Sequence, residues 1–139
     1  MPARIVPVTP ETMSPELWAQ FRQMMGGVVD RSRGRLTIET LIDDLECGAV
    51  TLWAVMEYEQ VVSFATTRVI DYPSRLRVFR IDNAAGRMED ALEFMPTMMR
   101  LAQEAGAHKL RIEGRDGWKA VFPDFHHVST IIEKEVDYG

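Results

Sequence analysis

The sequence has little cysteine, fewer basic than acidic residues and no long apolar run. Cys47 is its only cysteine, so no disulfide can form within the chain, which fits a reducing cytosol. The formal net charge of -5 argues against nucleic acid as the main partner, because phosphate binding depends on clustered Lys and Arg. No apolar run is long enough to cross a membrane, and residues 1–4 lack the apolar core of a signal peptide. We therefore expect no nucleic-acid partner and no membrane partner.

Patterns that hold metals or activate nucleophiles are also missing. His126 and His127 are adjacent in a segment that alternates like a strand, so their side chains point to opposite faces and cannot bind one metal together. His108 stands alone, and no spacing of His, Cys, Asp or Glu matches a metal site. No Ser-His-Asp or Cys-His arrangement is recognisable either. We therefore expect no metal.

Length and composition are those of one globular domain. The chain has 139 residues, of which 46% are apolar and 27% charged, enough for a single domain with its own core over residues 1–139. Its nine methionines either fill irregular gaps in that core or form an adaptable contact surface.

The clearest pattern lies in residues 77–118. Residues 77–81 alternate polar and apolar side chains, as in a half-buried strand, and Asn83-Ala84-Ala85-Gly86 ends that strand. From Met88 the apolar residues recur every three or four positions, which is one face of a helix, and Gly106 ends it. Pro96 lies inside this helix and is expected to kink it. Residues 109–113 alternate again and predict a second strand.

This strand–helix–strand unit indicates where to look for a functional site. Two strands joined by a helix are usually parallel neighbours with a right-handed crossover. Ligands of such units lie beyond the carboxyl ends of the strands. Those ends are residues 82–86 and 113–118, so we expect any chemistry there.

The rest of the chain adds flanking elements. In order, the sequence predicts an edge strand at 4–8, a helix from Ser14 to Gly26-Gly27, a loop at 28–35, a helix at 38–46 capped by Thr37, a hairpin at 50–70, a short helical turn at 118–122 and a closing strand at 126–136. In the hairpin, Leu52 and Ala54 share one face and Trp53 and Val55 the other. Both faces are apolar, so we expect the hairpin inside a sheet that helices cover on both sides.

This order of elements resembles the fold of the Gcn5-related N-acetyltransferases (GNAT), and the chain is most similar to GNAT-like proteins encoded by tailed phages. The segments that carry the resemblance are Gly48-Ala49-Val50-Thr51-Leu52-Trp53, Asp71-Tyr72-Pro73, Ala85-Gly86-Arg87-Met88, residues 102–106 and Gly114-Arg115-Asp116-Gly117-Trp118. The resemblance implies an α/β (α+β) single domain with a mixed, mainly antiparallel sheet and helices on both faces. It also implies that the sheet splays between the strands at 77–81 and 109–113.

The resemblance further implies that acetyl-CoA binds at this splay, with its diphosphate on backbone N–H groups of a glycine-rich turn after the fourth strand. The corresponding residues are Asn83, Ala84, Ala85, Gly86, Arg87 and Met88. Asn83 stands where the family has glycine, and Asp82 is expected to repel the diphosphate. Gly86 and Arg87 form an alternative cradle. From these departures we expect weak or absent acetyl-CoA binding.

Glu113 is the candidate catalytic base for an amine, because it lies at a strand end beside the expected cofactor. The alternative is a surface carboxylate paired with Arg111 or Arg115. Phe122 occupies about the place of the family's tyrosine, which protonates the leaving thiolate. Trp118 with Arg115 either belongs to the core or forms a protein contact, a role in which Trp and Arg are common.

Two classes of function follow from the resemblance. One is an acetyl-CoA-dependent N-acetyltransferase acting on an amine of a protein or small molecule. The other, which the departures at Asn83 and Phe122 favour, is a non-catalytic GNAT-like phage protein that binds another phage or host protein. Such a protein is expected in the host cytoplasm or with the virion, as a monomer or a homo-oligomer.

Overall fold

A five-stranded mixed sheet forms the centre of the protein. The computed structural model describes residues 4–86, 89–113 (backbone only over 89–93), 123–128 and 131–138. The elements are β1 (Arg4–Val8), η1 (Pro10–Thr12), α1 (Pro15–Arg31), α2 (Ile38–Glu46), β2 (Thr51–Glu57), β3 (Gln60–Asp71), β4 (Arg77–Ala85), α3 (Glu89–Glu104) and β5 (Lys109–Ile112). The strands follow the order β1-β2-β3-β4-β5. The first four pair antiparallel, and β5 pairs parallel with β4 after the crossover through α3.

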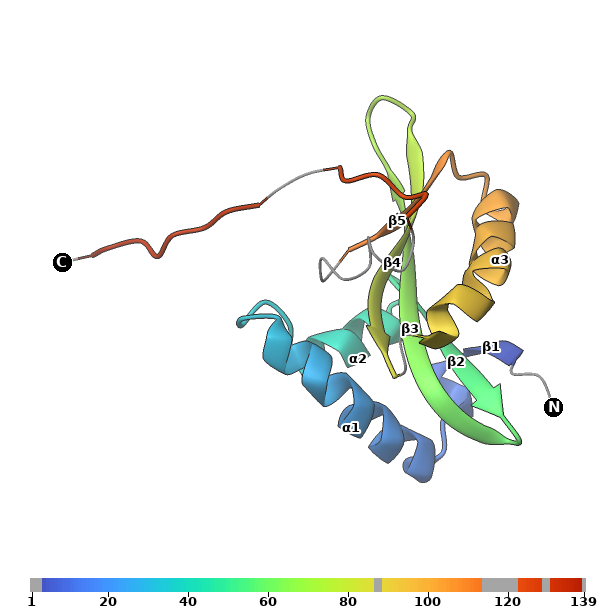
Figure 1. Cartoon of the computed structure of the whole chain (residues 1–139). Helices are drawn as coiled ribbons and strands as arrows, with labels where there is room; N and C mark the ends of the chain where they lie inside the picture. Colours follow the sequence, from blue (N-terminus) through green and yellow to red (C-terminus); the bar gives the residue numbers. More distant parts are fainter. Residues whose placement is uncertain (1–3, 87–88, 114–122, 129–130, 139) are drawn as a thin grey trace.

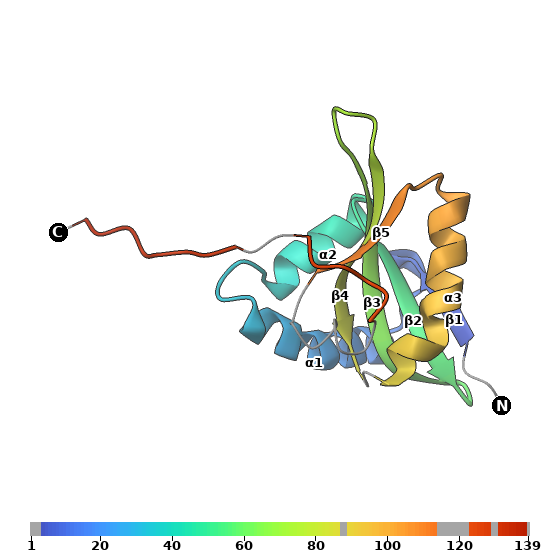
Figure 2. The ribbon, with the colours of Figure 1, turned by 45° about the horizontal axis from the view of Figure 1, so that its top comes forward.

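Helices cover both faces of the sheet, as expected. Helices α1 and α2 lie on one face and α3 on the other (Figures 1 and 2). Leu52 and Ala54 of β2 are buried in the core cluster under α1 and α2, while Trp53 packs against the cluster under α3. Strand β2 lies between β1 and β3, so the prediction of an interior hairpin is confirmed. No helix in the described part of the chain is long and apolar enough to cross a membrane.

Side-chain caps begin the first two long helices. Ser14 Oγ accepts a hydrogen bond from the Leu17 amide at 3.1 Å, and Thr37 Oγ1 accepts one from the Thr40 amide at 3.1 Å. Both caps satisfy an N–H group that has no partner within the helix. The predicted helix starts are therefore confirmed.

The end of α1 differs from the prediction. The helix continues through Gly26 and Gly27 to Arg31, because Met25 is fully buried and Val28 and Val29 pack against the same core. Burial of these side chains outweighs the helix cost of glycine, which is about 1 kcal/mol per residue. The predicted loop at 28–35 is correspondingly shorter.

Strand β4 also runs further than expected. The prediction that it ends at Ile81 is wrong, because Asn83, Ala84 and Ala85 continue the pairing with β3. The register shifts between the pairs made by Ile81 and Asn83, so Asp82 is an extra residue on β4. A bulge of this kind bends the strand and lets pairing resume beyond it.

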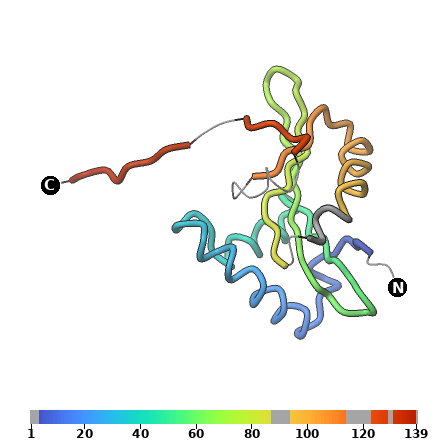
Figure 3. Tube along the Cα trace, viewed as in Figure 1, coloured from blue at the N-terminus to red at the C-terminus, as the bar shows by residue number. Residues whose placement is uncertain are grey.

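The predicted closing strand at 126–136 does not form in the parts of it that the structure describes. Residues 126–128 and 131–136 have no strand or helix structure, and the segment 131–138 extends away from the domain (Figures 1 and 3). Alternation of apolar residues predicts a strand only where a partner edge is available. The helical turn predicted at 118–122 lies outside the described residues.

Candidate functional site

Strand β4 outlasts its pairing with β5, and we call the edge of residues 82–85 on the side of β5 the notch. The parallel pairing runs from Val78 with Lys109 to Ile81 with Ile112, and the Glu113 amide then donates to the Ile81 carbonyl at 3.3 Å. Strand β4 continues to Ala85. On the side of β5, residues 82–85 therefore have no strand partner among the described residues. The splay that the resemblance implied stays a prediction, because residues 114–122, which follow β5, lie outside the described part of the chain.

Gly86 closes the end of β4 before α3 begins. Its φ is +128°, and a Cβ atom there would lie 2.2 Å from Ser63 Cβ and 2.9 Å from the Val62 carbonyl oxygen. Only glycine tolerates that approach. Gly86 brings the chain directly against β3, while Arg87 and Met88, the other two members of the expected cradle, lie outside the described residues.

Asp82 is neutralised by two arginines. Its Oδ2 accepts a hydrogen bond from Arg68 Nε at 3.1 Å, and its Oδ1 accepts one from Arg80 Nε. The side chain is only 10% exposed, and Arg68 also contacts Asp44 of α2 at 3.4 Å. The hydrogen bond to Asp82 raises the pKa of Arg80, which stays charged. The expected repulsion of a diphosphate by Asp82 therefore needs correction, because two adjacent positive charges offset it.

The remaining cofactor candidates in β4 are strand residues. Asn83 Nδ2 lies 3.3 Å from Thr66 Oγ1, which is fully buried, and donates to it. Ala85 is buried in the core under α1 and α2. Asn83, Ala84 and Ala85 thus form an extended edge rather than the predicted turn, and their part in cofactor binding stays a prediction.

Glu113 takes part in an ion pair. Arg80 Nη1 donates to its carboxylate at 3.3 Å, and Arg111 Nη1 lies 3.9 Å away. The side chain is half exposed. Of the two interpretations from sequence, the paired carboxylate describes this geometry, with Arg80 as the main partner and Arg111 as a weaker one.

A row of arginines crosses the sheet beside the notch. Arg68, Arg80 and Arg111 are direct neighbours on β3, β4 and β5, and Arg111 donates to the Tyr72 hydroxyl at 2.8 Å. Its guanidinium also lies 5.7 Å from the centre of the Tyr72 ring, a cation–π contact. Sequence reasoning missed this row, because it depends on the register of three strands.

Other candidates from the sequence have structural roles or lie outside the described residues. Nδ1 of His108 accepts a hydrogen bond from the Arg77 amide at 3.0 Å and so ties β5 to β4. Arg115 and Trp118, the predicted protein-contact residues, are not among the described residues. In the described ranges, no group of three or more His, Cys, Asp or Glu is placed to hold a metal ion.

Comparison with known proteins supports the fold alone. No family model matches the chain, and neither does any curated protein. Among solved structures, an aminoglycoside acetyltransferase from an uncultured soil metagenomic sample matches with a TM-score of 0.67, 13% identity and complete coverage of both chains. A ribosomal-protein-alanine N-acetyltransferase from Brucella melitensis biovar Abortus 2308 matches with a TM-score of 0.64 and 11% identity, covering 99% of this chain and 100% of that one.

A third similar structure was solved with acetyl-CoA. It is a predicted acetyltransferase from Clostridium acetobutylicum solved with acetyl-CoA, which matches with a TM-score of 0.63 and 16% identity over 96% of each chain. Identities this low show a shared architecture and carry no shared activity. The five-stranded mixed sheet, the helices on both faces and the matches to these solved structures show that this chain has the fold of the GNAT acetyltransferases.

Proposed function

We propose that this protein binds acetyl-CoA in the notch between β4 and β5 and transfers the acetyl group to an amine. The observation that carries the proposal is the edge of β4 over residues 82–85, which no strand in the described part of the chain pairs with on the side of β5. This edge ends at Gly86, shortly before α3 begins at Glu89. The solved acetyltransferases with this fold, one of them holding acetyl-CoA, support it.

The residues beside the notch suit this cofactor. The pantetheine arm of acetyl-CoA is extended and carries amides, and a strand edge without a pairing strand, such as the half-buried one that the described residues 82–84 form, can pair with such a chain. The charge of Asp82 is already offset by Arg68 and Arg80. Gly86 and Arg87 precede the start of α3, where helix dipole and free amides favour an anion. We propose that the Arg87 guanidinium grips the diphosphate.

Glu113 is the proposed proton acceptor for the amine. Bound acetyl-CoA supplies a thioester, so attack by the amine nitrogen forms a C–N bond, breaks the C–S bond and releases the thiol. Arg80 holds the Glu113 carboxylate on one side, and the side chain remains 52% exposed. The exposed part of the carboxylate is available to take the amine proton.

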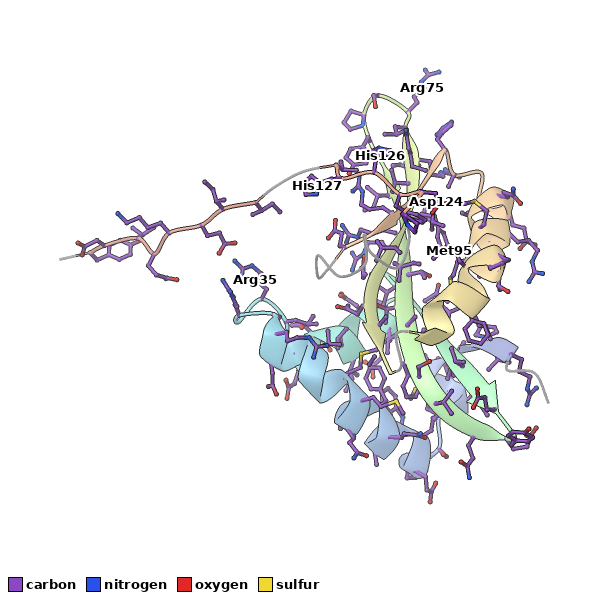
Figure 4. The ribbon with its side chains drawn as sticks, in the orientation of Figure 1. Arg35, Arg75, Met95, Asp124, His126 and His127 are labelled. Carbon is purple, nitrogen blue, oxygen red and sulfur yellow. The ribbon has the colours of Figure 1, made fainter. Side chains whose placement is uncertain are left out.

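Titration calorimetry with acetyl-CoA tests the proposal. We expect saturable binding that weakens about tenfold in Arg87→Ala, because a charge-assisted contact to phosphate is lost. Arg75→Ala is the matched control, since Arg75 lies on the turn between β3 and β4 at the far end of the sheet (Figure 4). Absence of heat at millimolar acetyl-CoA would overturn the proposal.

A second readout separates binding from catalysis. Release of free thiol from acetyl-CoA in the presence of a primary amine should fall in Glu113→Gln, with binding of acetyl-CoA unchanged. Tight binding without thiol release for any amine tested would support a cofactor-binding protein that is not a transferase.

One observation favours the second candidate, a GNAT-like protein that binds a phage or host protein without catalysis. Helix α3 begins at Glu89, and Asp90 follows it, so two acidic residues lie in the turn where the diphosphate would bind. The same titration decides between the candidates: no binding in the wild type, with binding gained in Glu89→Gln/Asp90→Asn, would support the second. Pull-down from infected cells with Trp118→Ala as the control would then test Arg115 and Trp118 as the contact.

A further inference from the structure

Arg111 differs from the other two arginines of the row across the sheet. Arg68 and Arg80 each donate a hydrogen bond to Asp82. In the described part of the chain, the nearest carboxylate to Arg111 is that of Glu113, and its distance of 3.9 Å from Nη1 is too long for a hydrogen bond. The Arg111 side chain is only 23% exposed, so its guanidinium has lost much of its contact with water without gaining a carboxylate in return. An anion from outside the chain would supply the missing partner.

Tyr72 fixes the Arg111 guanidinium from one side. Arg111 Nη1 donates a hydrogen bond to the Tyr72 hydroxyl at 2.8 Å, and the guanidinium lies 5.7 Å from the centre of the Tyr72 ring. The N–H groups on Nε and Nη2 of Arg111 donate to no acceptor among the described residues. The guanidinium is therefore held in one orientation and still has an edge that can donate two parallel hydrogen bonds to a carboxylate.

Arg111 and Glu113 lie on the same face, next to each other. Leu110 and Ile112 pack in the cluster under α3, so Arg111 and Glu113 alternate with them onto the opposite face. The Glu113 side chain is 52% exposed. Because the two charged groups are 3.9 Å apart, one small molecule contacts both only if its amine and its anion are close together. Amino acids have that spacing of amine and carboxylate.

We propose, on the basis of the proposed function, that the acceptor is a free amino acid whose carboxylate binds Arg111 and whose amine faces Glu113. The amine nitrogen then forms the C–N bond to the acetyl carbon and the C–S bond of the thioester breaks. One amine proton passes to Glu113, and the thiolate that leaves takes up a proton from water. The product is an N-acetylamino acid.

Thiol release from acetyl-CoA, measured with each common amino acid and with its own amide, tests this assignment. The amide keeps the amine and the side chain and lacks the negative charge. We expect kcat/KM to be about tenfold or more higher for the acid, because a charge-assisted hydrogen bond to Arg111 is lost in the amide. In Arg111→Gln this ratio should fall to about one.

Lys109→Gln is the matched control, because Lys109 carries the same charge on the same face of β5. It should keep the preference for the acid. Equal turnover of acids and amides in the wild type, or a preference that both variants lose equally, would overturn the assignment to Arg111. Turnover of the peptide aspartyl-glycinamide but of no free amino acid would also overturn it, because the carboxylate would then come from a peptide side chain.

An NMR titration of the Arg111 Nε–Hε group with the same pairs needs neither acetyl-CoA nor turnover. We expect a saturable shift with the acid and none with its amide. Such a shift without thiol release would support the carboxylate site and would overturn the transferase instead. Identical responses to acid and amide, or no response to any amino acid, would overturn the carboxylate site even if the protein acetylates other amines.

Discussion

At the scale of single residues, Gly86 is constrained by both its backbone and its neighbour. Gly86→Ala places a Cβ atom 2.2 Å from Ser63 Cβ at a φ of +128°, so strand β3 must move or the turn must change. We expect the free energy of unfolding to fall by about 2–4 kcal/mol. Gly48→Ala is the control, because Gly48 also has a positive φ but no atom within 4 Å of the added carbon. Gly48→Ala should lower the free energy of unfolding, measured by urea denaturation, by about 1 kcal/mol. Equal losses in the two variants would contradict the close approach of Gly86 to Ser63.

Asp82 is the residue whose charge has the largest structural role beside the notch. Asp82→Asn leaves Arg68 and Arg80, both less than one third exposed, without their main carboxylate. We expect a loss of about 1–3 kcal/mol in the free energy of unfolding, smaller than for a fully buried pair because solvent screens both arginines.

Asp44→Asn serves as the control for Asp82→Asn. It removes only the longer contact to Arg68, at 3.4 Å, and Asp44 is more exposed than Asp82. Its cost should stay below about 1 kcal/mol. If the two variants were equally stable, Asp82 would be a surface charge rather than the centre of the cluster.

At the scale of elements, α3 contains a proline in its interior. Pro96 lies inside Glu89–Glu104, and Figure 1 shows one helix that changes direction along its length, as the sequence predicted. Pro96→Ala restores a backbone N–H group and removes the clash with the preceding turn. Since Pro96 is exposed, little packing is lost, and we expect the free energy of unfolding to rise by about 1–3 kcal/mol.

Gln103→Ala is the control for Pro96→Ala, because Gln103 is also exposed on α3. In urea denaturation it should change the free energy of unfolding by less than about 0.5 kcal/mol. A loss of stability in Pro96→Ala would show that the bend is needed. The bend would then position Met98 and Ala102, both buried, against the sheet.

At the scale of the whole molecule, the contact between Arg35 and Glu133 joins the C-terminal segment, residues 131–138, to the turn after α1. Arg35 donates a hydrogen bond and adds positive charge, which lowers the pKa of Glu133 below its ordinary value of 4.5. A lowered pKa means that the ion pair is present above the ordinary value and is lost as the pH falls through the lowered one. We therefore expect the contact between Glu133 and Arg35 to be present at neutral pH and to be lost in acid.

An NMR titration of the side-chain carboxyl carbons measures this directly. In Arg35→Gln, the pKa of Glu133 should return to its ordinary range. Arg4→Gln, which removes a different exposed ion pair with Glu59, should leave the pKa of Glu133 unchanged. A Glu133 pKa that does not respond to Arg35→Gln would show that the segment is not held at this turn in solution.

The sequence by itself determined the order of the elements and the faces that they bury. Apolar spacing predicted β2 and its two buried faces, and the Thr37 cap predicted the start of α2. The parallel neighbours on either side of α3 also followed from local pattern. These features depend on residues close in the chain, so periodicity and capping suffice to predict them.

Only the tertiary structure decided where elements end and which charges meet. Packing of Val28 and Val29 carries α1 past two glycines, and pairing with β3 carries β4 past the expected turn. From the sequence, the charge of Asp82 is expected to repel a phosphate, but the register of β3 and β4 places Arg68 and Arg80 beside it. Burial and strand register join residues far apart in the chain, and no local pattern contains them.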